Sequence, residues 1–98
     1  MYESPQLISA INNIVSGIPR GKYFDSHFVI FCLLKNHSDT YFRFIALFAN
    51  SENTVLTAHG QLAQEIGRCS SLVRKMDEES ISFNIHTNSG SCALWQRI

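Results

Sequence analysis

The chain has 98 residues, which is enough for one compact domain and no more. Hydrophobic residues make up 45% of it and charged residues only 16%, a balance that excludes intrinsic disorder. Eight Lys and Arg residues oppose eight Asp and Glu residues, so the formal net charge is zero. This balance excludes a uniformly basic nucleic-acid-binding surface, although it leaves room for a local basic patch.

The sequence favours a cytoplasmic protein without membrane contact. Its first residues, Met1–Pro5, have neither the basic nor the apolar region of a signal peptide. The longest apolar run, Phe28–Leu34, is far shorter than the ~20 residues that a membrane span requires. The three cysteines, Cys32, Cys69 and Cys92, are odd in number and widely spaced, which is typical of reduced thiols in an intracellular protein.

The first predicted element is a helix over residues 5–16. Leu7, Ile11 and Val15 recur at helical spacing and give the segment one apolar stripe. Gly17 and the proline that soon follows it would end this helix.

Two apolar stretches, residues 28–34 and 40–49, follow a connector that contains two glycines and a proline. Both are apolar on every side, so periodicity does not separate a buried helix from a buried strand. A β-hairpin that turns at residues 36–39 is the competing interpretation, because Val, Ile, Phe and Tyr favour strands. Residues that commonly cap helices, such as Asp25 and Ser26, favour two helices instead.

The C-terminal half predicts more helix and then a hairpin. Thr54 or Thr57 would cap a helix that Gly67 ends in the left-handed conformation, and residues 72–76 have helical spacing. Apolar and polar residues alternate on both sides of a turn at residues 86–91, which is typical of a β-hairpin. The expected fold is therefore α+β and mostly helical, with four to five helices followed by a C-terminal two-stranded hairpin.

Residues 61–76 resemble the helix-turn-helix DNA-binding motif. Ala63 is small where two helices would approach closely, and Gly67 falls four residues later, at the turn. The apolar Val73 would pack the second helix, at about residues 70–76, back onto the first. Together with the C-terminal hairpin, whose turn would be the wing, the pattern resembles a winged helix.

This resemblance implies a small transcriptional-regulator-like protein that binds double-stranded DNA. A homodimer is expected, because a single unit makes few base contacts. Hydroxyl and cationic side chains of the second helix would contact bases and phosphates, and the wing would contact the backbone. The residues that the resemblance assigns to DNA binding are Ser70, Ser71, Arg74, Lys75, His86 and Asn88.

The charge pattern leaves an alternative function open. Asp77, Glu78 and Glu79 directly follow the expected second helix and would repel phosphates unless they faced away. The neutral net charge and the aromatic residues within 41–48 favour a protein-interaction or accessory module that does not bind DNA.

Two short stretches of the sequence carry a second resemblance. Phe24–His27 and Cys92–Trp95, at this spacing in a short chain, resemble small bacterial proteins that are encoded on mobile elements such as integron gene cassettes. That resemblance implies a helical protein with a small C-terminal sheet, and it assigns no activity and no site residues.

The sequence predicts no metal, no other cofactor and no enzymatic activity. No two Cys or His residues have the close spacing of zinc ligands. Cys69 with His59 or His86 is the only candidate pair of a nucleophilic cysteine and a histidine base, and no glycine-rich oxyanion loop supports it. Trp95 is expected to be a core or interface anchor rather than a ligand-stacking residue.

Overall fold

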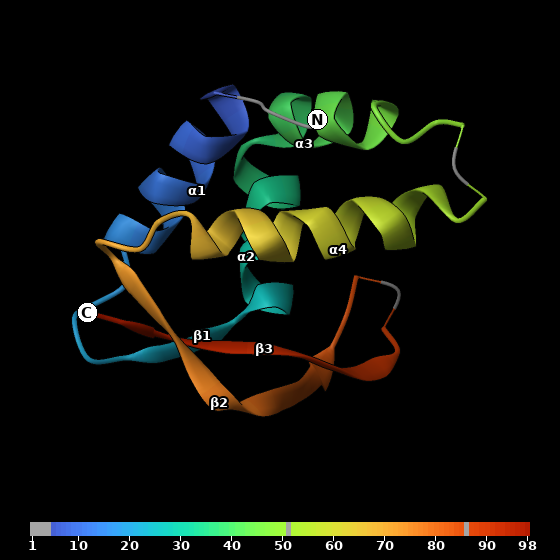
Figure 1. Ribbon diagram of the computed structural model, residues 1–98. Helices are drawn as coiled ribbons and strands as arrows, with labels where there is room; N and C mark the ends of the chain where they lie inside the picture. Colours follow the sequence, from blue (N-terminus) through green and yellow to red (C-terminus); the bar gives the residue numbers. More distant parts are fainter. Residues whose placement is uncertain (1–4, 51, 86) are drawn as a thin grey trace.

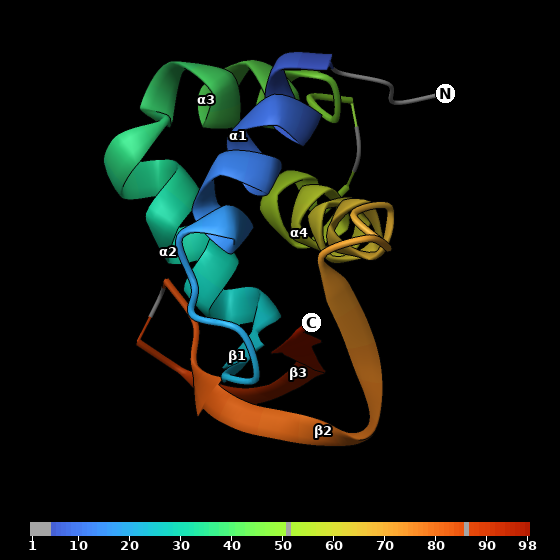
Figure 2. The same cartoon turned by 90° about the vertical axis from the view of Figure 1, so that its left-hand side faces the viewer.

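Helices cover one face of a small antiparallel sheet (Figure 1). A computed structural model describes residues 5–50, 52–85 and 87–98, and about half of the chain is helical. The helices are α1 (Pro5–Ser16), α2 (Ser26–Asn36), α3 (Ser38–Ala46) and α4 (Thr54–Gly67), and the strands are β1 (Tyr23–Asp25), β2 (Val73–Phe83) and β3 (Ser89–Arg97). The side view shows the two layers, with the start of α2 close to the sheet (Figure 2).

The two apolar stretches form α2 and most of α3, followed by a turn at residues 47–50, which confirms the helical interpretation over the hairpin. The side chain of Asp25 caps α2, because its Oδ1 accepts the Phe28 backbone N–H at 2.9 Å. Only His37 separates α2 from α3, and its backbone angles (φ −137°, ψ 46°) are not helical, so the chain changes direction there. The predicted first helix is also confirmed, and its apolar stripe is buried.

The sheet has three strands in the order β1-β3-β2, one strand more than predicted. β1 lies within the predicted connector and pairs with the end of β3, where Phe24 faces Trp95. Three residues are too few to show a period of two, so the sequence pattern gave no sign of this strand. β1 joins the start of α2 to the hairpin and so fixes the helices relative to the sheet.

The prediction of a second helix at about residues 70–76 is wrong. Residues 70–72 form a turn, and β2 begins at Val73 and continues to Phe83. The apolar positions that fitted helical spacing are explained differently, because Val73 packs into the core from the strand. β2 is irregular between Lys75 and Glu79, where its register with β3 shifts, and this bulge bends the strand.

Gly67 does not adopt the left-handed conformation that was predicted for it. Only Gly21 and Thr87 have a positive φ within the described segments, and α4 ends with Arg68 in a right-handed cap. A Cβ at Gly67 would lie 3.4 Å from the Trp95 ring, so the small residue admits the indole close to the helix. Gly67 therefore serves packing between α4 and the sheet.

Trp95 is the anchor between the layers, as predicted. It is 5% exposed, and its Nε1–H donates to the Oγ of Ser26 at 3.1 Å, which satisfies two buried polar groups at once. The core around it contains residues from every helix and every strand. Its buried hydrophobic members are Leu7, Ala10, Ile11, Val15, Phe24, Val29, Ile30, Leu33, Tyr41, Phe44, Phe48, Ala58, Leu62, Ile66, Cys69, Val73 and Trp95.

Candidate functional site

The residues that the sequence assigned to DNA binding do not share a helix. Ser70 and Ser71 are exposed in the turn after α4, and Arg74 and Lys75 are exposed on the first residues of β2. All four nevertheless lie at one end of the molecule, because the turn is short and β2 starts directly after it. The hydroxyl and cationic groups are thus brought together, although not in the way a recognition helix would arrange them.

The predicted wing residues lie at the opposite end of the hairpin. Asn88 is exposed, its backbone N–H donates to Asn84 Oδ1 at 3.1 Å, and its carbonyl accepts the Asn84 N–H at 2.9 Å. His86 lies outside the described residues. A fully extended strand from Arg74 to the hairpin turn would span about 30 Å, so Asn88 and Arg74 belong to separate regions.

Three further cations lie at the same end as Arg74 and Lys75. Arg20 and Lys22 come from the connector before β1, and Arg68 follows the last residue of α4. Figure 1 shows that this connector, the end of α4, the start of β2 and the C-terminal end of the chain all lie together. We call Arg20, Lys22, Arg68, Arg74 and Lys75 the basic end, and all five are exposed.

Backbone and side-chain contacts hold the two sides of the basic end together. The end of β3 lies between them, with Gln96 opposite Tyr23 on one side and Arg74 on the other. Arg74 Nη2 donates to Gln96 Oε1 at 2.6 Å, and Gln96 Nε2 donates to the Gly21 carbonyl at 3.3 Å. Neighbouring strands are about 4.8 Å apart, so the two basic segments are separated by about 10 Å.

Side-chain carboxylates are missing from the sequence segments that build the basic end. Residues 17–24, 66–76 and 94–98 contain no Asp and no Glu. The nearest acid along α4 is Glu65, which is 3% exposed and lies with its Oε2 3.1 Å from Arg68 Nε. The exposed acidic residues 77–79 follow Lys75 closely, at the bulge of β2. Arg20, Lys22 and Arg68 were not identified from the sequence, because only the fold brings them to Arg74.

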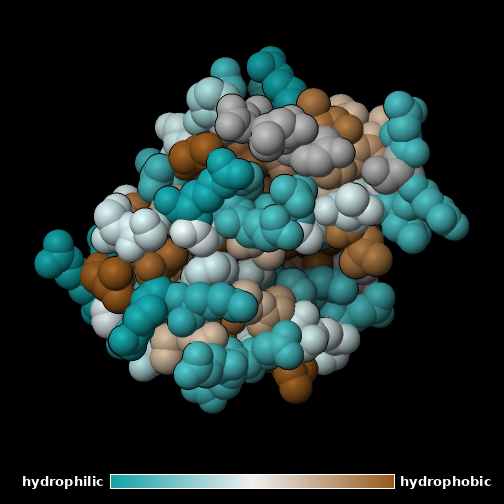
Figure 3. All heavy atoms as spheres, viewed as in Figure 1, coloured by the Kyte–Doolittle hydropathy of each residue, from teal (hydrophilic) through white to brown (hydrophobic). Residues whose placement is uncertain are grey.

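The exposed side of α4 is mostly polar, apart from the 74% exposed Leu56, and carries no accessible carboxylate. Thr57, Gln61 and Gln64 recur at spacings of four and three residues, and Arg68 continues their row toward the basic end. The opposite side of the helix packs into the core. Hydrophilic residues dominate the face of the molecule that includes α4, and its apolar residues form small separate patches (Figure 3). This face is therefore suited to a polar partner.

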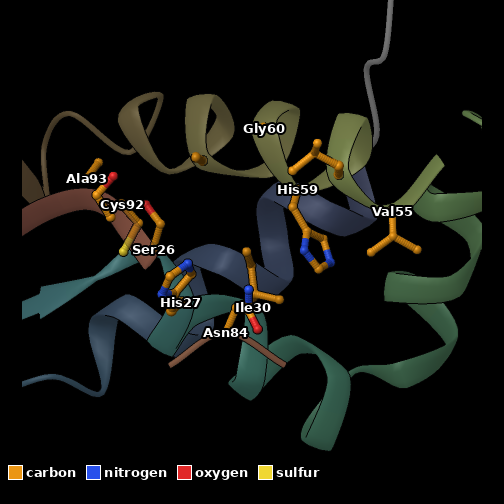
Figure 4. Close-up of a pocket in the computed structure, with 12 residues that line it drawn as sticks. Ser26, His27, Ile30, Val55, His59, Gly60, Asn84, Cys92 and Ala93 are labelled. Carbon is orange, nitrogen blue, oxygen red and sulfur yellow. The ribbon is translucent and has the colours of Figure 1, made fainter. Parts of the chain in front are cut away.

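A groove of about 310 Å³ lies between the first half of α4, the start of α2 and the far part of the hairpin. Val55, Leu56 and Gly60 line it from α4, and His27 and Ile30 line it from α2 (Figure 4). Residues 91–93 of β3 form the side that faces α4. The groove is distinct from the basic end, and no feature of the sequence pattern indicated it.

Polar side chains of β2 point toward the start of α2. Ser80 Oγ donates to Asp25 Oδ2 at 2.7 Å, and a 2.8 Å hydrogen bond joins Ser82 Oγ to His27 Nδ1. Burial alone would raise the pKa of Asp25, but the Phe28 N–H, the two serine hydroxyls and nearby His27 outweigh it and lower the pKa. This carboxylate therefore stays ionised and links the helix to the hairpin.

The cysteines are held in the less nucleophilic form. Burial raises the pKa of Cys69, and nearby Glu65 raises it further. Burial is also the main reason why the pKa values of Cys32 and Cys92 are raised. No three His, Cys, Asp or Glu side chains of the described residues gather in a metal-binding arrangement.

No helix within the described ranges is both long and apolar enough to cross a membrane. The segments Phe24–His27 and Cys92–Trp95 lie side by side, since Phe24 pairs with Trp95 and Asp25 with Leu94. Comparisons of the chain with protein-family models, with curated proteins and with solved structures gave no significant match.

Proposed function

We propose that the protein binds double-stranded DNA through its basic end. The observation that carries this proposal is the gathering of five exposed cations, from three separate segments, on a chain whose net charge is zero. Lys and Arg contacts to phosphates supply most of the affinity of DNA-binding proteins, and this contribution does not depend on base sequence. Ser70 and Ser71 add hydroxyl groups that donate to phosphate oxygens.

In this proposal α4, rather than residues 70–76, is the helix that faces the bases. The half-buried Gln61 and the exposed Gln64 lie in a row that leads to Arg68, and glutamine pairs well with the edge of adenine. β1 fixes the hairpin to the helices, so α4 and the hairpin present one rigid surface. The arrangement proposed is thus winged-helix-like, with the reading helix one element earlier than the sequence pattern suggested.

The salt dependence of DNA binding tests the role of the basic end. Binding of a fluorescent random-sequence duplex is measured by anisotropy over a series of salt concentrations. If the five cations contact five phosphates, the slope of log Kobs against log salt is about −4.5. Arg74→Ala/Lys75→Ala removes two of these contacts and is expected to bring the slope to about −2.7.

A double variant elsewhere on the molecule is the matched control. Lys35→Ala/Arg43→Ala removes the same charge from exposed positions on α2 and α3, outside the basic end. We expect it to leave the slope unchanged. Equal weakening by both double variants would show a diffuse charge effect, and absence of binding at low salt would refute DNA binding altogether.

Exposed aromatic residues on α2 support a second candidate function, protein interaction. Phe28 and Phe31 are 45% and 42% exposed, and with Lys35 they line an open hollow on the helix. Phenylalanines on a helix surface are typical of protein interfaces. A homodimer formed through this face would also place two basic ends in one assembly, so the two candidates are compatible.

A further inference from the structure

Tyr23 is an exposed aromatic side chain within the basic end. It is 57% exposed and comes directly after Lys22, at the start of β1. The next residue, Phe24, pairs with Trp95, and both of these side chains are buried toward the helices. Because successive side chains of a strand point to opposite faces, the Tyr23 ring lies on the face of the sheet opposite the helices (Figure 2).

One row across the three strands joins Tyr23 to Arg74. Gln96 of β3 lies opposite Tyr23 on one side and opposite Arg74 on the other, so the three residues share one face of the sheet. The Gln96 amide accepts a hydrogen bond from Arg74 Nη2 at 2.6 Å and donates one to the Gly21 carbonyl at 3.3 Å, which holds the row together. The row therefore presents an aromatic ring at one edge of the sheet and a cation at the other, about 10 Å apart.

Two sets of carboxylates limit where a phosphate can lie near Tyr23. Asp25 follows two residues later on the same strand, but its carboxylate accepts the Phe28 backbone N–H and the Ser80 hydroxyl and is thus bonded to α2 and the hairpin. The acids of the β2 bulge belong to the other edge strand, which β3 separates from β1. On the opposite side from Asp25, the chain leads from Tyr23 to Lys22 and the rest of the basic connector. A phosphate is therefore favoured on the Lys22 side of the ring.

An exposed aromatic ring beside cations is suited to an unpaired base. Within a duplex each base is stacked between its neighbours, and a side chain reaches the flat face of a base only where that base is unstacked. Proteins that bind single strands combine aromatic rings, on which the bases stack, with a positively charged path for the backbone. The five cations suffice for the phosphates of a duplex, whereas the Tyr23 ring has no use on a fully paired one.

We infer that the DNA bound by the basic end carries an unpaired base, which stacks on Tyr23. The ligand is then a duplex that continues into a single strand, such as a duplex end with an overhang. The backbone of the single strand lies on the Lys22 side of the ring, and the duplex lies on the remaining cations and α4. This inference rests on the proposed function, because it names the kind of DNA that the same surface binds.

Three fluorescent DNA probes, compared by anisotropy at low salt, test the inference. They are a blunt duplex, the same duplex with a short thymine overhang, and the same duplex with an overhang of abasic residues, which keeps the phosphates and removes the bases. We expect the thymine overhang to bind about tenfold more tightly than the abasic overhang. Equal binding of these two, with the blunt duplex also bound, would overturn the stacked base and leave DNA binding intact. Absence of binding by all three would refute the proposed function and this inference with it.

Two substitutions test whether Tyr23 is the residue on which the base stacks. Tyr23→Phe keeps the ring, and we expect it to keep the preference for the thymine overhang within about twofold. Tyr23→Ile keeps a side chain that favours strands but removes the ring, so the preference should be lost. It removes no charge, so the salt dependence of blunt-duplex binding should stay as in the wild type.

A substitution outside the basic end controls for the loss of an exposed aromatic side chain. Phe42 is 59% exposed on α3, and Phe42→Ala should keep the wild-type preference for the thymine overhang. A preference that persists in Tyr23→Ile, or that is lost equally in Phe42→Ala, would overturn the assignment to Tyr23.

Discussion

Asp25 shows how one carboxylate joins three parts of this small fold. It ends β1, caps α2 through the Phe28 N–H and accepts a hydrogen bond from Ser80 of the hairpin. These hydrogen bonds favour the ionised form and outweigh the opposing effect of burial, so the pKa is lower in the folded protein than in the unfolded chain. The stability that Asp25 contributes is therefore present above the pKa of the unfolded chain, about 3.9.

Asp25→Asn makes this contribution measurable. Asparagine still caps the helix, so we expect the variant to fold and to lose about 0.5–1 kcal/mol at pH 6, because its hydrogen bonds are no longer charge-assisted. Wild-type stability falls as the pH drops below about 4 and through the folded pKa, and the variant should fall less steeply over this window. Urea unfolding at pH 6 and pH 3 measures both effects.

Glu52→Gln, in the loop before α4, is the control for removal of a carboxylate. It should keep the wild-type difference in unfolding free energy between pH 6 and pH 3. An acid-induced loss in Asp25→Asn as large as that of the wild type would show that this carboxylate is not stabilising.

At the scale of elements, Gly60 makes α4 less stable than an alanine at the same position would. Gly60→Ala is expected to raise the free energy of unfolding by about 0.5–1 kcal/mol, because alanine favours the helix and its methyl group meets open space. Urea denaturation measures the change. Gly67→Ala is the contrasting variant, since its Cβ would meet the Trp95 ring, and it should gain less or lose stability. A loss in Gly60→Ala would mean that the helix itself needs this glycine.

Much of the element order was predictable from the sequence. The apolar stripe of α1 reports burial directly, and that helix agrees with the structure. The alternation near the end of the chain correctly indicates strands, but it does not report which residues are buried. The prediction of a helix at residues 70–76 was wrong because a short apolar spacing fits one turn of helix and one irregular strand equally well. β1 was missed because its pairing with β3 is a tertiary contact between distant residues.

The orientation of the hairpin was not predictable from alternation. Ile81 and Phe83 are 77% and 65% exposed, whereas Ser80 and Ser82 face the start of α2. Hydrogen bonds to Asp25 and His27 hold Ser80 and Ser82 toward the start of α2. An alternating pattern of apolar and polar residues indicates the two-residue period of a strand, but not which face of the strand packs against the helices. The same limit applies to the candidate site, where Arg74 and Lys75 were identified but their partners from the connector were not.

At the scale of the whole molecule, a net charge of zero conceals an uneven distribution. Five of the eight Lys and Arg residues lie at the basic end, while the exposed acids Asp39 and Glu52 lie on α3 and the loop that follows it, and the exposed acids 77–79 lie at the bulge of β2. Local charge rather than net charge determines where a polyanion binds, especially at low salt. The composition therefore excluded a uniformly basic surface but was compatible with the local basic end.

NMR mapping of DNA on the 15N-labelled protein tests the central claim most directly. A short duplex is added at low salt, and the shifts of backbone amide signals are recorded along the chain. We predict that the largest shifts occur at residues 20–22 and 68–75 and on the exposed side of α4, and that added salt reverses them. Shifts confined to Phe28–Lys35 of α2, or no shifts at all, would contradict a DNA-binding basic end.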